Sequence, residues 1–151
     1  MSQNLKAFLD MIAFSEIGPV LLAASDNGYN VIVGGALFHS YSDHPRKLVW
    51  LPRLHINSTA AGRYQLLARY FDAYRVSLKL HDFSPASQDA IAIQQIKEQR
   101  ALPLIECGDF SAAIDRVSNI WASLPGAGYG QHENKLADLE KAYRAAGGVL
   151  A

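Results

Sequence analysis

The stretch from residue 5 to residue 19 reads LKAFLDMIAFSEIGP, and it defines the first element of the predicted fold. Its apolar residues, Phe8 and Ile12 among them, recur every three or four positions, which is the spacing of one face of an α-helix. Gly18-Pro19 is expected to end the helix, because glycine leaves the helical conformation easily and proline has no N–H to continue it. The stretch therefore predicts an amphipathic helix that packs onto a core.

Glu16 occupies an unusual place on this helix. A helix turns about 100° per residue, so Glu16 points within about 20° of Leu5, into the middle of the apolar stripe. Helix-end carbonyls and removal from water both disfavour the charged form, so the sequence predicts a raised pKa for Glu16. A glycosidase needs such an acid to protonate a leaving oxygen. Two structural alternatives stay open: the helix ends before Glu16, or its carboxylate caps a loop.

Beyond this helix, short apolar runs separated by turn residues are typical of strands in a small antiparallel sheet. The expected strands cover residues 29–33, 36–41 and 48–51. The rest of the chain shows helical spacing and capping residues. The expected helices run from Tyr64 to about residue 78, from Ser84-Pro85 to about residue 100, from Asp109 through Trp121, and from residue 136 to about residue 143. This order predicts an α+β fold with a substrate cleft between a small antiparallel sheet and a mainly helical lobe.

Composition places the chain among globular proteins. The 151 residues fit a single core, and 50% of them are apolar whereas 19% are charged. We therefore expect residues 1–151 to form one domain. The 14 Lys and Arg residues balance the 14 Asp and Glu residues, so no net field favours nucleic acid or an anionic membrane as a partner.

The cysteine content and the first residues bear on location. Cys107 is the only cysteine, so no internal disulfide can form and a protein made in the cytoplasm is expected. Lys6, Asp10 and Glu16 interrupt the first apolar stretch, so neither a signal peptide nor a membrane insertion is expected. A substrate outside the inner membrane would then require a separate protein that opens the membrane.

Three short motifs carry a resemblance to a known family. Ser15-Glu16, Gly62-Arg63-Tyr64-Gln65 and Ala127-Gly128-Tyr129-Gly130 are similar to the three-part motif of lysozyme-like lytic transglycosylases. In that motif a glutamate, a turn ending in glutamine and a later tyrosine loop line one sugar cleft. The chain further resembles the bacteriophage lambda endolysin family along nearly its whole length. The shared runs are KAFLDM (6–11), GY (28–29), VIVGG (31–35), YSDHPRKLV (41–49), GRYQLL (62–67) and NIWASLPGAGYG (119–130).

The resemblance implies a lysozyme-like catalytic domain that cleaves the bond between N-acetylmuramic acid and N-acetylglucosamine in peptidoglycan. Cleavage would use no water and leave a 1,6-anhydro end, with Glu16 as acid and then as base. Because the 6-hydroxyl of the same sugar is the nucleophile, no second carboxylate is required. No metal or organic cofactor is implied. We expect a monomer that a holin releases from the host cytoplasm onto the periplasmic wall, causing host lysis.

The glutamine motif supplies most of the expected substrate contacts. The Gln65 amide can hydrogen-bond sugar amides and the Tyr64 ring can pack on a sugar face, while Gly62 forms the turn. From spacing alone Tyr64 is expected in the core, because it lies on the apolar stripe with Leu67 and Phe71. Ser58 and Thr59 can reach substrate hydroxyls or cap the following helix.

Two further tyrosines are expected to contact the glycan. Tyr129 stands in a glycine-rich loop, where an aromatic ring is placed for stacking on sugar, and Tyr41 is a candidate of the same kind at the end of the sheet. Trp121 shares the stripe of its helix and is expected in the core. The chain departs from the family in the apolar residues 17–24, where the lambda protein has a polar segment.

Other function classes rest on other side chains. A hydrolytic muramidase would use Asp26 or Asp43 as a second carboxylate, although turn chemistry explains both residues. A zinc amidase would use His39, Asp43 and His44, although their spacing matches no metallohydrolase helix motif. A non-catalytic peptidoglycan-binding module is compatible with the aromatic loops.

Overall fold

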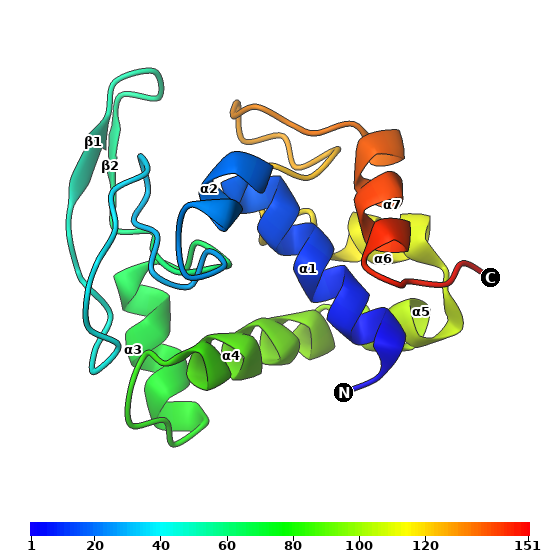
Figure 1. Cartoon of the computed structure of the whole chain (residues 1–151), viewed down its shortest axis with the longest axis horizontal. Helices are drawn as coiled ribbons and strands as arrows, with labels where there is room; N and C mark the ends of the chain where they lie inside the picture. Colours follow the sequence, from blue (N-terminus) through cyan, green and yellow to red (C-terminus); the bar gives the residue numbers. More distant parts are fainter. The chain divides into compact units, whose positions relative to one another are not determined.

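The computed structural model describes residues 1–151, and the chain forms two compact units (Figure 1). Unit 1 contains residues 1–16 and 92–151, and unit 2 contains residues 17–91. The helix α4, Pro85–Glu98, begins in unit 2 and ends in unit 1. No helix is both long enough and apolar enough to cross a membrane.

Unit 1 is helical and is built around α1, Gln3–Ile17, whose last residue belongs to unit 2. The Ser2 hydroxyl accepts the Leu5 N–H at 3.1 Å and so caps the start of α1. Phe8 is fully buried, and its ring meets the rings of Phe110 and Tyr143 edge-on at 6.1 and 6.5 Å. Burial of such a side chain contributes roughly 1.5–3 kcal/mol. The predicted amphipathic helix is confirmed, and it reaches Glu16.

The remaining helices of unit 1 are α5 (Leu102–Cys107), α6 (Phe110–Val117) and α7 (Leu136–Ala145), which Figure 1 shows beside α1. The sequence analysis did not anticipate α5, which Gly108 ends in a left-handed conformation. The predicted cap of α6 is confirmed, because Asp109 Oδ1 accepts the Ala112 N–H at 3.3 Å. Trp121 lies beyond α6 rather than on it, but it is buried as expected.

Unit 2 holds a two-stranded antiparallel sheet of β1 (Val49–Leu51) and β2 (Ile56–Ser58). The strand predicted at residues 48–51 is confirmed. The strands predicted at residues 29–33 and 36–41 were wrong, because these segments form only isolated pairs such as Val31 with Leu37. Two consecutive glycines with positive φ reverse the chain at residues 34–35 into a short hairpin, in which the Ile32 N–H donates to the Ala36 carbonyl at 2.7 Å. The hairpin is too short to count as two strands, and Ile32 also forms an isolated bridge with Ala61.

Two helix boundaries in unit 2 differ from the prediction. Pro19 does follow the end of α1, but it also begins a short helix, α2 (Pro19–Ala23), because proline fits the first helical position. The helix expected from Tyr64 begins only at Ala68, as α3 (Ala68–Ser77). Gln65 has a positive φ of 51°, which no helix accommodates, so the glutamine motif is a turn.

The start of α4 follows the prediction, because Ser84 Oγ accepts the Ser87 N–H at 3.3 Å and Pro85 is the first helical residue. A buried apolar cluster joins α3 and α4 to the turns of unit 2. Its members are Ile32, Phe38, Ala61, Leu66, Phe71, Phe83 and Ile91. This cluster holds the glutamine turn against α4, whereas the end of α1 is fixed within unit 1.

Candidate active site

Glu16 lies in the last turn of α1 and is partly buried. Removal from water raises its pKa from 4.5 to about 7, although a hydrogen bond with the Ser123 side chain acts in the opposite direction. A carboxyl group with this pKa is present in both its protonated and its ionised form near neutral pH. The helix position of Glu16 had predicted this rise.

Polar side chains from two other segments of unit 1 meet the end of α1. Ser123, which follows α6, has its Oγ 2.8 Å from the Oγ of Ser15. Asn134, which precedes α7, donates from Nδ2 to Ser15 Oγ at 2.9 Å and to the Ser15 carbonyl at 3.2 Å. The Asn134 N–H donates to the Ser123 carbonyl at 2.7 Å. These hydrogen bonds join the last turn of α1 to the segments that carry Ser123 and Asn134.

The glycine-rich loop of unit 1 is held by Glu133. Its two carboxylate oxygens accept the N–H groups of Gly126 and Gly128 at 2.9 and 3.1 Å, which lowers the pKa of Glu133. Within this loop Tyr129 is 55% exposed, and its hydroxyl donates to the Asn119 carbonyl at 2.7 Å. The ring of Tyr129 is therefore fixed at its far end and open to a ligand on its faces.

In unit 2 the glutamine motif is a tight turn. The Gly62 N–H donates to the Val31 carbonyl at 2.8 Å, and Nε2 of Gln65 donates to the Gly62 carbonyl at 2.8 Å. Gln65 is half-buried and keeps its left-handed backbone. Its side chain therefore supports the turn, and part of it remains accessible.

Tyr64 is placed in the core of this turn and is only 5% exposed. Its hydroxyl donates to Asp89 Oδ1 at 2.7 Å and accepts from Arg63 Nη1 at 3.0 Å. The Arg63 guanidinium lies over the rings of Tyr29 and Tyr64. The burial of Tyr64 agrees with the core position that its spacing predicted, and its hydrogen bonds stabilise the turn.

Gln88 on α4 clamps the same turn. Its Oε1 accepts the Arg63 N–H at 2.9 Å, and its Nε2 donates to the carbonyls of Tyr29 and Phe83 at 3.0 and 2.9 Å. A Cβ on Gly62 would lie 2.4 Å from this Oε1, so only glycine fits there. The sequence analysis missed Gln88, because its partners lie up to 59 residues away in the chain.

The two remaining predicted contacts have structural partners in unit 2. The Tyr41 hydroxyl donates to Asp26 Oδ2 at 2.5 Å, and burial together with this bond raises the pKa of Tyr41. Ser58, at the end of β2, accepts the Ala60 N–H at 3.1 Å. The hydroxyl of Thr59 accepts the N–H of Ala68, the first residue of α3, and so satisfies one free N–H at the start of this helix, whose N-cap residue is Leu67.

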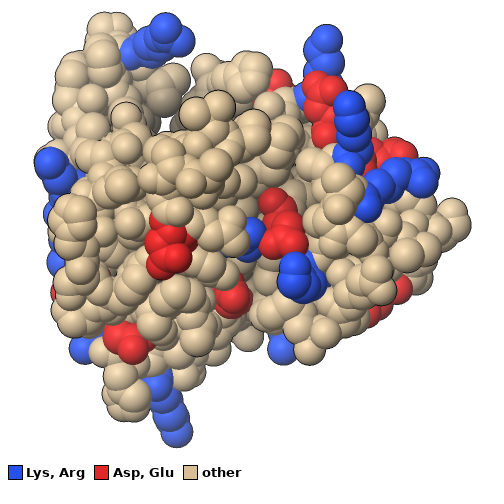
Figure 2. Space-filling view, in the orientation of Figure 1, with Lys and Arg blue, Asp and Glu red and all other residues tan.

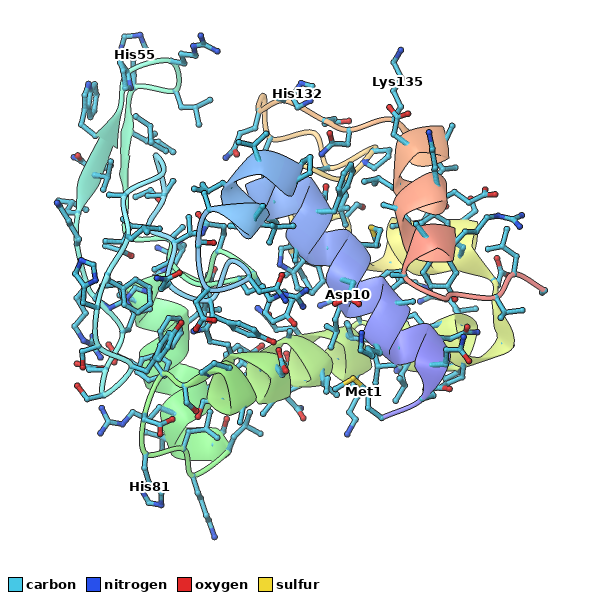
Figure 3. All side chains as sticks on the ribbon, in the orientation of Figure 1. Met1, Asp10, His55, His81, His132 and Lys135 are labelled. Carbon is cyan, nitrogen blue, oxygen red and sulfur yellow. The ribbon has the colours of Figure 1, made fainter.

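The groups that suggested a zinc amidase are engaged elsewhere. Asp43 pairs with Arg46 at 3.0 Å, which lowers the pKa of Asp43. His44 is buried, with Nε2 2.8 Å from the Leu66 carbonyl and Nδ1 accepting the Arg46 N–H. His55 and His81 lie at opposite ends of unit 2 (Figure 3). No three His, Cys, Asp or Glu side chains are arranged to hold a metal ion.

Trp50 is an exposed aromatic side chain that the sequence analysis did not consider. Trp50 on β1 is 52% exposed and meets the His55 ring edge-on at 6.1 Å. Its exposure could not be predicted from the apolar run 48–51, because a strand of three residues is too short to show the alternation of inward and outward side chains.

On the face shown in Figure 2, positively and negatively charged side chains are interspersed. The electrostatic field of this face therefore has no single sign, as the balanced composition led us to expect.

Comparison with known proteins places these features in a family. The sequence model of the Endolysin family matches residues 6–150. The endolysin of Escherichia phage lambda is 61% identical over 147 residues, which cover 96% of this chain and 92% of that protein. The endolysin of Escherichia phage P2 is 49% identical over 158 residues, which cover 99% of this chain and 96% of that protein.

Solved structures agree with the sequence comparisons. Bacteriophage lambda lysozyme complexed with a chitohexasaccharide matches with a TM-score of 0.95 at 57% identity, covering 100% of this chain and 98% of that one. Lysozyme from bacteriophage lambda matches with a TM-score of 0.85 at 56% identity over the same shares of the two chains. The predicted α+β, lysozyme-like fold is confirmed. The chain belongs to the endolysin family.

Proposed function

We propose that this protein is a lytic transglycosylase that cleaves the β-1,4 bond between N-acetylmuramic acid and N-acetylglucosamine in peptidoglycan. The observation that carries the proposal is the pKa of Glu16, which burial at the end of α1 raises to about 7. General acid–base catalysis is most efficient when the catalytic pKa is close to the working pH. Glu16 thus suits a role as acid in one step and as base in the next.

The reaction proceeds in two proton transfers. Protonated Glu16 gives its proton to the bridging oxygen, the bond from the muramic acid C1 to that oxygen breaks, and the N-acetylglucosamine end leaves with a 4-hydroxyl. The ionised Glu16 then takes the proton of the muramic acid 6-hydroxyl. The 6-oxygen bonds to C1 of the same sugar and closes the 1,6-anhydro ring, so no water is consumed and Glu16 regains its proton.

A glycan substrate is supported by the relatives. One structural relative is a lysozyme complexed with a chitohexasaccharide, which is an oligosaccharide. In this chain we assign Tyr129, Tyr41, Ser58 and the Gly62–Gln65 turn to glycan binding. The exposed ring of Tyr129 supports stacking on a sugar face. Tyr64 is assigned to holding the Gln65 turn, since its own ring is buried.

The placement of Asp26 and Asp43 favours transglycosylation over hydrolysis. A retaining or inverting hydrolase uses a second carboxylate as nucleophile or base. Asp43 is paired with Arg46, and Asp26 accepts the hydroxyl of Tyr41. Both carboxylates thus have structural roles in unit 2. A hydrolytic muramidase that uses Asp26 or Asp43 remains the alternative that the product test addresses.

Mass spectrometry of digested cell walls tests the proposal. We expect 1,6-anhydro-muramic ends, which are one water lighter than reducing ends, and we expect Glu16→Gln to abolish their formation. Reducing ends would instead establish hydrolysis. An active Glu16→Gln variant would remove Glu16 from the mechanism.

The cellular route is a second part of the proposal. We propose that the protein stays in the host cytoplasm as a monomer until a holin permeabilises the inner membrane and gives it access to periplasmic peptidoglycan. Expression in a host with and without a membrane-permeabilising treatment tests this route. Lysis on expression alone would contradict it.

A further inference from the structure

His44 is a buried histidine whose two ring nitrogens both meet the backbone. It is 2% exposed, its Nε2 lies 2.8 Å from the Leu66 carbonyl oxygen, and its Nδ1 accepts the Arg46 N–H at 2.9 Å. A carbonyl oxygen can only accept a hydrogen bond, and a backbone N–H can only donate one. The ring hydrogen therefore sits on Nε2, Nδ1 carries none, and the imidazole is neutral.

The Leu66 carbonyl belongs to the residue pair that closes the turn containing Gln65. The Ala61 N–H donates to the Leu66 carbonyl at 3.0 Å, and the Leu66 N–H donates to the Ala61 carbonyl at 2.9 Å. Residues 62–65 form the loop between these two residues. A carbonyl oxygen has two lone pairs, so the Leu66 carbonyl binds Nε2 of His44 in addition to the Ala61 N–H. His44 is thus attached to the residue that directly follows Gln65.

The place of the imidazole is fixed by α3 and by the segment before α4. The Arg46 guanidinium donates to both carboxylate oxygens of Asp72 on α3, at 2.6 and 3.1 Å, and this holds the residue whose N–H binds Nδ1. The centres of the Phe71 ring on α3 and of the Phe83 ring lie 5.9 and 4.8 Å from that of the imidazole. Packing and Arg46 therefore hold the ring, and its Nε2 passes this position on to the turn.

We propose that His44 is a positioning residue that, as a neutral imidazole, holds the Leu66 carbonyl and so places Gln65 for contact with the glycan. The inference deepens the proposed function and rests on the assignment of Gln65 to glycan binding. Gln65 has a positive φ of 51°, a conformation that persists only where the surroundings impose it. Loss of the His44 bond lets the turn relax and displaces the Gln65 amide. It should therefore weaken glycan binding more than the chemical step at Glu16, which lies in unit 1.

The bond to Leu66 depends on the charge of His44. A protonated imidazole carries a hydrogen on both nitrogens, so Nδ1 would point its N–H at the N–H of Arg46. The ring would have to leave its place, and Nε2 would leave the Leu66 carbonyl with it. Burial also opposes protonation and lowers the pKa of His44 below its usual value, although the Leu66 bond acts in the opposite direction. His44 thus positions the turn only in its neutral form.

The charged side chains around His44 largely cancel one another. Arg46 and Asp43 come from its own segment and pair at 3.0 Å. Asp72 and Arg75 come from α3, and Arg75 reaches Asp43 at 3.9 Å. The segment before α4 presents a phenylalanine ring to the imidazole, and the Gln65 turn presents a backbone carbonyl, neither of which is charged. Two positive and two negative charges do not hold a proton on the ring, so burial and the Arg46 N–H decide its charge.

Two substitutions separate the two hydrogen bonds of His44. In His44→Asn, Oδ1 can still accept the Arg46 N–H, but the shorter side chain ends before Leu66. In His44→Gln, the uncharged amide nitrogen reaches further and can donate to the Leu66 carbonyl. On soluble glycan fragments near neutral pH, His44→Asn should raise KM about five-fold, as expected for one lost hydrogen bond, with kcat within about two-fold. His44→Gln should return KM to within about two-fold of that of the unaltered protein.

His81→Gln is the matched control, because His81 is an exposed histidine of the same unit. It should change neither KM nor kcat. Circular dichroism at the assay temperature checks that each variant is folded, since a smaller side chain at a buried position lowers stability. An unchanged KM in folded His44→Asn overturns the inference.

A titration of the unaltered protein adds a measurement that a merely structural role would not change. Nitrogen NMR of labelled histidine gives the tautomer and the titration midpoint of each ring, and the His44 signal is identified by its loss in His44→Gln. We expect Nε2 of His44 to carry the hydrogen near neutral pH. KM should rise over the pH range in which His44 gains its second proton, and this rise should be absent in His44→Gln. A constant KM through that range, or a hydrogen on Nδ1 near neutral pH, overturns the inference.

Failure of this inference is distinguishable from failure of the proposed function. The proposed reaction is read from the cleavage products and from Glu16→Gln, whereas the role of His44 is read from KM. An unchanged KM in His44→Asn beside a raised KM in Gln65→Gly overturns the inference alone. Unchanged cleavage by Gln65→Gly overturns the glycan-binding role of Gln65 and this inference together.

Discussion

Gly62 and Gln88 are packed so closely that a Cβ on residue 62 would lie 2.4 Å from Oε1 of Gln88. Gln88 is 3% exposed and holds Arg63, Tyr29 and Phe83 by three hydrogen bonds to their backbones. The side chain is therefore unable to move aside without losing these bonds. The contact fixes the glutamine turn of unit 2 on α4.

Gly62→Ala should therefore lower the free energy of unfolding by about 3 kcal/mol, which combines a positive φ of 83° with the loss of Gln88 contacts. Gly126→Ala is a matched control, because Gly126 has φ of 80° but no atom within 4 Å of an added Cβ. It should cost only about 1 kcal/mol of backbone strain. Denaturant unfolding of the two variants measures the difference. Equal losses would show that the contact with Gln88 contributes nothing.

Glu16 should destabilise the folded chain in neutral and alkaline solution. Its folded pKa of about 7 lies above the value of 4.5 expected when unfolded, so the folded state binds the proton more tightly. The stability that protonated Glu16 contributes is fully present below pH 4.5 and is lost as the pH rises from there through 7. Glu16→Gln should then raise the free energy of unfolding by about 3 kcal/mol at pH 8 and change it little at pH 4. A gain that is the same at both pH values would refute this explanation.

The local features of Glu16, Ser84 and Asp109 could be predicted from the sequence, because helix spacing and capping involve residues within four positions of each other. The contact between the Ser15 and Ser123 hydroxyls could not, since the two residues are 108 positions apart in the chain. Serine side chains give no pattern that marks such a contact.

The errors in unit 2 have the same origin. The segments 29–33 and 36–41 have strand composition, but they pair with each other only briefly, at Val31 with Leu37, and Ile32 also pairs with the distant Ala61. The start of α3 was misplaced because Tyr64 fits the helical stripe, whereas the left-handed Gln65 follows from contacts with Gly62 and Val31. Spacing therefore indicated the burial of Tyr64 but not the conformation of the turn that contains Tyr64 and Gln65.

The ring of Tyr129, rather than its hydroxyl, should determine glycan binding. Tyr129→Phe loses the hydrogen bond to the Asn119 carbonyl but keeps the stacking face, so KM should rise less than about three-fold. Tyr129→Ala should raise KM about ten-fold, corresponding to a stacking contribution of roughly 1.4 kcal/mol. Tyr70→Ala, at a 46% exposed tyrosine on α3, is the control. A rise in KM that is larger for Tyr129→Phe than for Tyr129→Ala would contradict a stacking role.

Gln65 offers a way to separate activity from stability. Its positive φ of 51° strains any side chain, whereas glycine adopts it freely. Gln65→Gly gains this freedom but loses the 2.8 Å bond from Nε2 to the Gly62 carbonyl, so the unfolding free energy should change by less than about 1 kcal/mol. If the amide binds the glycan, kcat/KM should nevertheless fall at least about five-fold, because each lost hydrogen bond to substrate costs about 1 kcal/mol or more. Lys79→Gly is the matched control, since Lys79 has a similar φ of 55° in unit 2 and no assigned role. Unchanged cleavage by Gln65→Gly would show that Gln65 stabilises the turn and does not bind the glycan.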